Sequence, residues 1–133
     1  MKRTLTAIVL ALLLGGCAGG VGAVPSASPT ASPTPIKPPM VIYELDGTAT
    51  DANITIETPT GMSQQSVDVP LRNKSGSKGL RFTDFNYGAF LYISAQNDGE
   101  YGDLTCRIRV DGEVVSENTA SGAYAIATCQ ARR

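Results

Sequence analysis

The chain has 133 residues, of which 42% are hydrophobic, 17% are charged and 6% are aromatic, and its formal net charge is −1. The lack of histidine excludes Ser-His-Asp and Cys-His nucleophile systems and imidazole metal sites. The near-neutral charge argues against a nucleic-acid partner, which requires clustered lysine and arginine. After a predicted export signal and tether, 93 residues remain for folding, enough for a single hydrophobic core.

Residues 1–16 have the pattern of a lipoprotein signal peptide. A basic start, Met-Lys-Arg, precedes the apolar run Leu5–Leu14, and ten helical residues rise only about 15 Å, half the hydrocarbon thickness of a bilayer. The run is followed by Gly-Gly-Cys ending at Cys17, which resembles the bacterial lipobox. That resemblance implies that Cys17 receives a diacylglyceryl thioether and becomes the new N-terminus. The alternative is ordinary signal cleavage near Ala18 or Ala23.

Residues 17–40 are predicted to comprise the lipidated cysteine and a disordered linker. From Pro25 to Pro39, eleven of fifteen residues are proline, serine or threonine. Such a segment has too few apolar side chains to offset its ordering entropy, so we expect an unfolded tether stiffened toward polyproline II. A passive spacer is the simplest interpretation, and a wall-spanning or O-glycosylated stalk, with Thr30 and Thr34 as acceptors, is the alternative. Acyl chains on Cys17 would anchor the protein to the extracytoplasmic face of the cell membrane.

Beyond this linker, apolar and polar residues alternate with the period of half-buried strands. The clearest strand is predicted over Leu104–Val110, where Cys106 faces the core with the apolar residues and Thr105, like the two arginines of the strand, points the other way. Asp111-Gly112 follows and predicts a two-residue hairpin turn, because both residues tolerate the positive φ of a type I′ turn.

The same alternation recurs along the rest of the predicted domain, residues 41–133. It is found over residues 41–45, 54–56, 67–69, 91–95 and 123–129, and Val114-Val115 are expected to begin the return strand of the Asp-Gly hairpin. No window has an apolar stripe at helical spacing, so about seven short strands predict an all-β fold, a small antiparallel β-sandwich of the immunoglobulin-like kind. The polar segment 72–79 is predicted to be a flexible loop between the two halves.

Cys106 and Cys129 remain as a pair once Cys17 is lipidated. Both lie on the apolar side of a predicted strand, and the oxidising environment of an exported protein favours a bridge between them. A redox-active pair is the alternative, but it would lack Cys-x-x-Cys spacing and a histidine to lower a thiol pKa. The sequence therefore predicts one structural disulfide.

Two other patterns suggest chemistry, and both are incomplete. Ser75-Gly-Ser-Lys78 matches the Ser-x-x-Lys nucleophile motif of penicillin-binding enzymes, but its partner motifs are missing. Asp98, Glu100 and Asp103 offer carboxylate oxygens to a calcium ion without the EF-hand spacing, which is more typical of a solvated turn. We therefore expect no catalytic residue, no metal site and no cofactor.

Five of the eight aromatic residues fall between Phe82 and Tyr92. Such clustering is typical of a core with tyrosines at the strand edges. The alternative is an exposed aromatic surface for a protein or lipid partner. The sequence leaves both interpretations open.

The most distinctive segment is Cys106–Val115, which reads Cys-Arg-Ile-Arg-Val-Asp-Gly-Glu-Val-Val and is followed by Gly122-Ala-Tyr124 and Cys129. Upstream segments complete the pattern: Tyr43–Ala49, Ala52–Ile56 and Gln64–Pro70. Together they resemble the MmpS family, small accessory proteins of mycobacterial and related actinobacterial envelopes. The resemblance does not extend to the leader or the tether, since typical members carry an uncleaved transmembrane helix. Leu71 also stands where the family often has tryptophan.

The resemblance implies an extracytoplasmic β-sandwich with a disulfide that works beside an MmpL transporter of the resistance-nodulation-division (RND) class in exporting lipids or siderophores. The predicted function is therefore that of a non-enzymatic, membrane-anchored envelope lipoprotein, an accessory factor of an MmpL/RND-type transporter. Two alternatives remain. One is a surface lipoprotein that binds a small lipid, glycan or cell-wall component directly, and the other is an envelope exclusion factor acting on another membrane protein.

Overall fold

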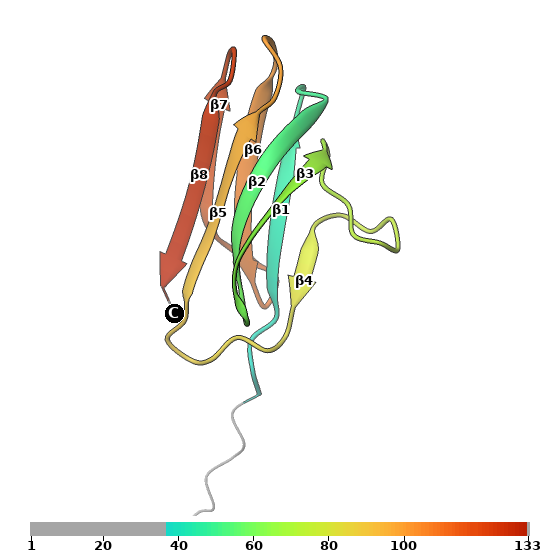
Figure 1. Cartoon of the computed structure of the whole chain (residues 1–133). Helices are drawn as coiled ribbons and strands as arrows, with labels where there is room; N and C mark the ends of the chain where they lie inside the picture. The colour runs from blue at the N-terminus through green and yellow to red at the C-terminus, as the bar shows by residue number, and fades with distance from the viewer. Residues whose placement is uncertain (1–36, 133) are drawn as a thin grey trace, which may run out of the picture. The chain divides into compact units, whose positions relative to one another are not determined.

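Figure 1 shows a computed structural model of the protein, which describes residues 37–132. These residues form eight strands and no helix, which confirms the predicted all-β class with one strand more than expected. The strands are β1 (Val41–Gly47), β2 (Asp51–Thr58), β3 (Gly61–Asp68), β4 (Leu80–Phe82), β5 (Phe90–Asn97), β6 (Asp103–Val110), β7 (Glu113–Ser121) and β8 (Ile126–Arg132).

The eight strands make two antiparallel sheets of four strands each (Figure 1). Sheet A has the order β4-β1-β6-β7, and sheet B has the order β3-β2-β5-β8. Among the described strands, β2–β3 and β6–β7 are hairpins within one sheet, and every other connection crosses from one sheet to the other. These crossings wind the chain around a shared core, which gives the predicted β-sandwich.

The core lies between the sheets and is filled by the inward-facing half of each alternating strand. Every second residue of Leu104–Val110 is buried and the residues between them are half-exposed, which confirms the predicted orientation of β6. The central strand β1 is also covered on its outer face, where Ile42 and Glu44 are less than a tenth exposed. Gly79 packs so closely against these two side chains that an added Cβ would clash with Ile42.

The hairpin between β6 and β7 has the predicted turn. Asp111 and Gly112 have φ values of 51° and 95°, and Val110 pairs with Glu113 across them. The register then shifts, so that Val115 is the extra residue of a β-bulge.

β3 is the strand that hydrophobic alternation did not reveal. Only residues 67–69 were expected to be extended, whereas Gly61–Asp68 pairs with β2 along its whole length. The strand forms because Pro59-Thr60 makes a tight turn in which the Thr58 hydroxyl donates to the Gly61 carbonyl (2.6 Å). Its side chains are mostly polar and exposed, so it lacks the alternating signature of a half-buried strand.

Two other expectations need correction. The strand predicted over residues 123–129 begins only at Ile126, because Tyr124 lies in a turn with a φ of 53°. The segment 72–79 does link the two sheets, but hydrogen bonds hold it in a defined conformation. Arg72 and Lys78 form an isolated antiparallel bridge, and the side chain of Asn73 accepts backbone hydrogen bonds from Ser75 and Ser77.

Candidate functional site

The predicted lipidation site, Cys17, lies outside the described residues, as do the signal peptide 1–16 and most of the linker. None of the described residues forms a helix that is long and apolar enough to cross a membrane. Lipid attachment at Cys17 therefore stays a prediction.

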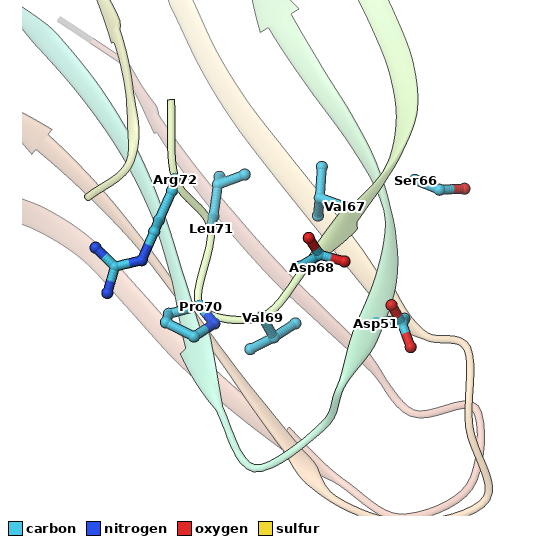
Figure 2. A pocket seen from close by; sticks show the side chains of 8 residues that line it. All are labelled: Asp51, Ser66, Val67, Asp68, Val69, Pro70, Leu71 and Arg72. Atoms are coloured by element: carbon cyan, nitrogen blue, oxygen red, sulfur yellow. The ribbon is translucent and has the colours of Figure 1, made fainter. Parts of the chain in front are cut away.

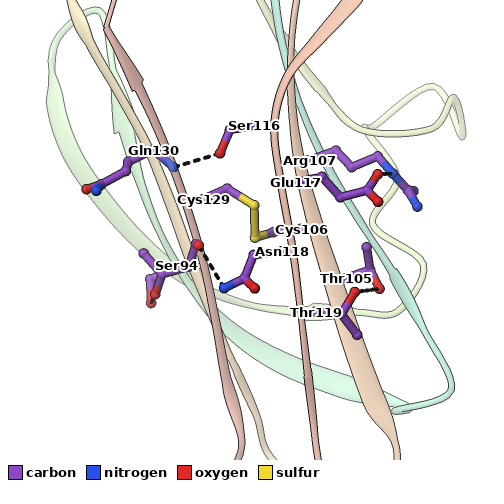
Figure 3. Close-up of a disulfide and its surroundings, with 11 residues drawn as sticks. Ser94, Thr105, Cys106, Arg107, Ser116, Glu117, Asn118, Thr119, Cys129 and Gln130 are labelled. Carbon is purple, nitrogen blue, oxygen red and sulfur yellow. Dashed lines mark hydrogen bonds and ion pairs between the residues drawn. A yellow bond between two sulfur atoms is a disulfide. The ribbon is translucent and has the colours of Figure 1, made fainter.

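The predicted disulfide is present and closes one flank of the sandwich. It joins Cys106 of β6 to Cys129 of β8, and so links sheet A to sheet B through the core (Figure 3). Both cysteines are buried, so the sulfur atoms are shielded from solvent thiols. This environment fits a structural rather than a redox-active pair.

Side chains of β7 close the same flank from outside. The Gln130 N–H donates to the Ser116 hydroxyl (3.2 Å), as Figure 3 shows beside the disulfide. The Asn118 amide donates to the Thr128 carbonyl (3.1 Å). Both backbone groups lie on the side of β8 that points away from β5, by the alternation of the β5–β8 ladder. The centre of the β8 edge is therefore hydrogen-bonded, and another strand cannot pair there.

The opposite edge of sheet B, at β3, has no such cover. The Val69 N–H donates to the Thr50 carbonyl (2.9 Å), and this pair fixes the alternation along the β2–β3 ladder. Because the backbone groups of successive residues point alternately toward and away from β2, those that point away belong to Met62, Gln64, Ser66 and Asp68. Within residues 37–132 these groups make no hydrogen bond, so β3 is an open edge.

Two surface clefts flank the open edge, one near each end of β3. The cleft at its C-terminal end has a volume of about 520 Å³ and is lined by Asp51 and by residues 66–72 (Figure 2). Asp51 and Asp68 face each other across the β2–β3 ladder there, and Arg72 lines the same cleft, so this end has two carboxylates and one guanidinium. The second cleft, of about 550 Å³, lies between the β2–β3 turn and β4, and its lining includes Met62 and Asp84.

The predicted aromatic cluster divides into a buried and an exposed part. Phe82 and Phe85 join Tyr43 in a three-ring group with centroids 5.8 to 6.4 Å apart, which confirms the core interpretation for this part. Burial raises the pKa of Tyr43 to about 12. Tyr87 and Phe90, by contrast, are 77% and 43% exposed. The cluster therefore contributes to the core and also to the surface.

The outer face of sheet A carries paired charges. Arg107 contacts Asp46 (2.8 Å) and also pairs with Glu117, and the hydrogen bond to Glu117 raises the Arg107 pKa. Arg109 pairs with the buried Glu44 (3.1 Å). Since these charges neutralise one another, the face offers no concentrated charge to a ligand.

The two incomplete motifs remain incomplete in three dimensions. Lys78 pairs with Asp46 (2.6 Å), and the Ser75 hydroxyl donates to Asn73 (2.7 Å), so neither group activates the other. Asp98 accepts a hydrogen bond from Asn53 (3.2 Å). No cluster of three or more side chains able to hold a metal ion occurs in residues 37–132.

No protein-family model and no curated protein matches this chain. The structural feature that sequence reasoning missed is the open edge at β3. A signal for it was available, because Thr58-Pro59-Thr60-Gly61 places a tight turn directly after the predicted strand 54–56, and a tight turn brings the next residues back alongside that strand.

Proposed function

We propose that this protein is a non-enzymatic, lipid-anchored component of the cell envelope that acts by contact, as an accessory factor of an MmpL/RND-type transporter. The observation that carries the proposal is the open edge of β3. An edge with unpaired N–H and C=O groups binds an extended segment of another polypeptide by adding it to the sheet.

The β3 edge suits this mode of binding in length and in surroundings. Its eight residues contain no proline or lysine, the residues that commonly block edge pairing. The clefts at its two ends can receive side chains of the added strand, which would give specificity beyond the main-chain hydrogen bonds. The facing carboxylates of Asp51 and Asp68 favour a partner strand with a basic residue at that end.

The predicted anchor supplies the reason for a partner in the membrane. A lipid on Cys17 and a linker that reaches on the order of 70 Å when extended would confine the domain near one bilayer. That confinement raises its effective concentration toward any protein embedded in the same membrane. The resemblance to the MmpS family supports a transporter as the partner class.

In-cell crosslinking tests the proposal directly. A photo-crosslinking residue at Gln64, on the open edge, is expected to capture an RND-type transporter, whereas the same residue at Val114, exposed on sheet A, is not. Capture should fall in the Cys17→Ala form, which cannot be lipidated. Intact-mass measurement of the mature wild-type protein should show the added acyl mass. Enrichment of wall fragments or lipid with no membrane protein from the Gln64 position would reject the accessory role.

A further inference from the structure

A cleft at the end of the sandwich where β5 begins has the mixed lining that sugars require. It lies between the β2–β3 turn and the loop that leads into β5, and it has a volume of about 430 Å³. Glu57 and Pro59 line one side, and residues 85–90 line the other. The volume is within the range of small-ligand pockets, which combine aromatic surface with a few polar groups.

The aromatic part of this site is exposed and held in place. Tyr87 and Phe90 line the cleft, and Phe90 stacks on Tyr92 with ring centroids 6.1 Å apart and planes inclined by 25°. On the neighbouring strand, the Arg132 guanidinium lies 5.9 Å from the Phe90 centroid. Three planar groups thus extend from the cleft onto the outer face of sheet B. Phe90 still keeps 43% of its surface exposed.

Polar groups with unused hydrogen-bonding capacity surround these rings. The carboxylate of Glu57 and the amide of Asn86 line the cleft, and Gln130 pairs with Tyr92 in the β5–β8 ladder. Within residues 37–132, none of these three side chains makes a hydrogen bond or an ion pair. They are therefore available to the hydroxyl and amide groups of a ligand.

The chemistry of the face favours a glycan over a lipid or a nucleic acid. A pyranose ring has an apolar C–H face that packs on aromatic rings and a rim of hydroxyl groups that hydrogen-bond to amides and carboxylates. Among residues 37–132, Arg132 is the one cation that β5 and β8 place on this face, whereas anionic lipid headgroups and phosphates are bound by clusters of cations. The remaining outward residues of these strands are largely amides and hydroxyls: Ser94, Gln96, Thr128 and Gln130.

We propose that this cleft, with the Phe90–Tyr92–Arg132 row, binds a glycan strand of the cell envelope that carries N-acetylated hexoses. Sugar rings pack against Tyr87 and Phe90, while Glu57, Asn86 and Gln130 hydrogen-bond to hydroxyl and acetamide groups. The site goes beyond the accessory role and shares only its premise of export to the envelope. The cleft adjoins the one near the start of β3, since Thr58 and Pro59 line both. Its rings and amides, however, come from the loop before β5 and from β5 and β8, so variants at Tyr87, Phe90 and Asn86 leave the β3 backbone unchanged and the two proposals are tested by different substitutions.

The test uses the full-length lipoprotein in detergent, with purified peptidoglycan sacculi and the soluble tetramer of N-acetylglucosamine as probes. We expect co-sedimentation with the sacculi and saturable binding of the tetramer by calorimetry. Phe90→Ala and Tyr87→Ala should each weaken binding at least tenfold. Tyr101→Ala is the matched control, since Tyr101 is 83% exposed in the turn at the other end of β5, and it should bind like the wild type.

Loss of affinity in Phe90→Ala counts only if the variant is folded, which an intact disulfide and an unchanged circular dichroism spectrum establish. Asn86→Ala, which changes a loop side chain without a hydrogen bond among the described residues, provides a second variant and should weaken binding several-fold. Absence of binding to both probes would overturn the proposal, as would equal binding by the wild type and the Tyr87 and Phe90 variants. Binding to phosphatidylglycerol vesicles in place of both glycans would also overturn it.

Discussion

The two edges of sheet B have similar lengths but opposite accessibility. β8 is covered by a strand of the other sheet, because Ser116 and Asn118 of β7 bond to its outward-facing backbone. β3 has no equivalent neighbour, and its outward-facing groups stay unbonded within the described residues. An edge strand is protected here by the sheet across the core, and a sandwich can therefore close one flank while keeping the other for a partner.

The interior repeats this contrast. The flank with β8 is crossed by the disulfide, whereas the flank with β4 is filled by the rings of Tyr43, Phe82 and Phe85. One side is therefore held by a covalent bond, and the other by noncovalent contacts that include the hydrogen bond from the Tyr92 N–H to the Tyr43 hydroxyl (3.4 Å). We expect the closed flank to stay folded in local openings that expose the β3 side.

Breaking the disulfide should have the largest effect. Cys129→Ala is expected to lower the free energy of unfolding by about 2–5 kcal/mol. Without the cross-link between the sheets, the unfolded chain has more conformational entropy. Urea denaturation measures this loss. The double variant Cys106→Ala/Cys129→Ala controls for the free thiol and should lose a similar amount. Quantitative labelling of both thiols in native, unreduced wild-type protein would contradict the bridge itself.

Removing the side-chain cover of β8 should convert the closed edge into a second open one. Replacing Ser116 and Asn118 together with alanine is expected to cost about 1–2 kcal/mol, because two backbone groups lose their partners at a partly solvated site. Hydrogen exchange at the Gln130 amide should accelerate. Thr119→Ala is the control, since Thr119 lies on the same strand but bonds to Thr105 rather than to β8. Unchanged exchange at Gln130 would show that the cover is not protective.

The sequence predicted the closed flank much better than the open one. β6 alternates strictly and Asp111-Gly112 specifies its turn, so the strand and its inward cysteine follow from local rules. The disulfide was predicted because Cys129 is the cysteine that remains to pair with Cys106 once Cys17 is assigned to the lipid. β3 is mostly polar, with only Val67 packed against the core, and its position depends on pairing with β2 more than on burial. Hydrophobic periodicity cannot detect such a strand.

The cleft proposed to bind a glycan could not be predicted from the sequence for a different reason. It forms where Glu57 at the end of β2 and Pro59 of the β2–β3 turn meet residues 85–90. These segments are distant in the sequence and are brought together by crossings between the sheets. The aromatic cluster was visible in the sequence, but the division between buried Phe85 and exposed Tyr87 depends on how the loop before β5 packs. Tertiary packing, rather than composition, determines both.

The packed flank can be tested separately through Tyr43. Its folded-state pKa of about 12 lies above the ordinary value of 10, so the folded protein holds this proton more tightly than the unfolded chain. The contribution of this proton to the free energy of unfolding is fully present below pH 10 and is lost as the pH rises from 10 to 12. At pH 11 the wild type should have lost about 1 kcal/mol that Tyr43→Phe does not lose.

Urea denaturation of both proteins at pH 8 and pH 11 measures this difference, because titration of all other groups is common to both. Tyr101→Phe, at an exposed position outside the core, is the matched control. A stability difference between Tyr43→Phe and the wild type that does not change with pH would show that the Tyr43 hydroxyl is not desolvated in the folded protein.

The smallest effect on stability is expected at the open edge, where the effect on binding should be greatest. Gln64→Pro removes an N–H that points away from β2 and makes no hydrogen bond within residues 37–132. The free energy of unfolding should therefore change by no more than about 1 kcal/mol. Gln64→Ala is the matched control, because both variants lose the bond from the Gln64 amide to Thr55 (3.1 Å) but only proline removes the backbone donor.

With a photo-crosslinking residue placed at Met62, the alanine variant should capture the proposed partner to the extent expected of the wild type, and the proline variant should not. Such a difference would show that the partner pairs with the main chain of β3. The alanine and proline variants both lack the Gln64 side chain, and they differ in the backbone N–H and in the proline ring that replaces it. Equal capture by both would mean that the partner contacts side chains near β3 without adding a strand. In that case the difference between the two edges would be a property of the fold and not the basis of binding.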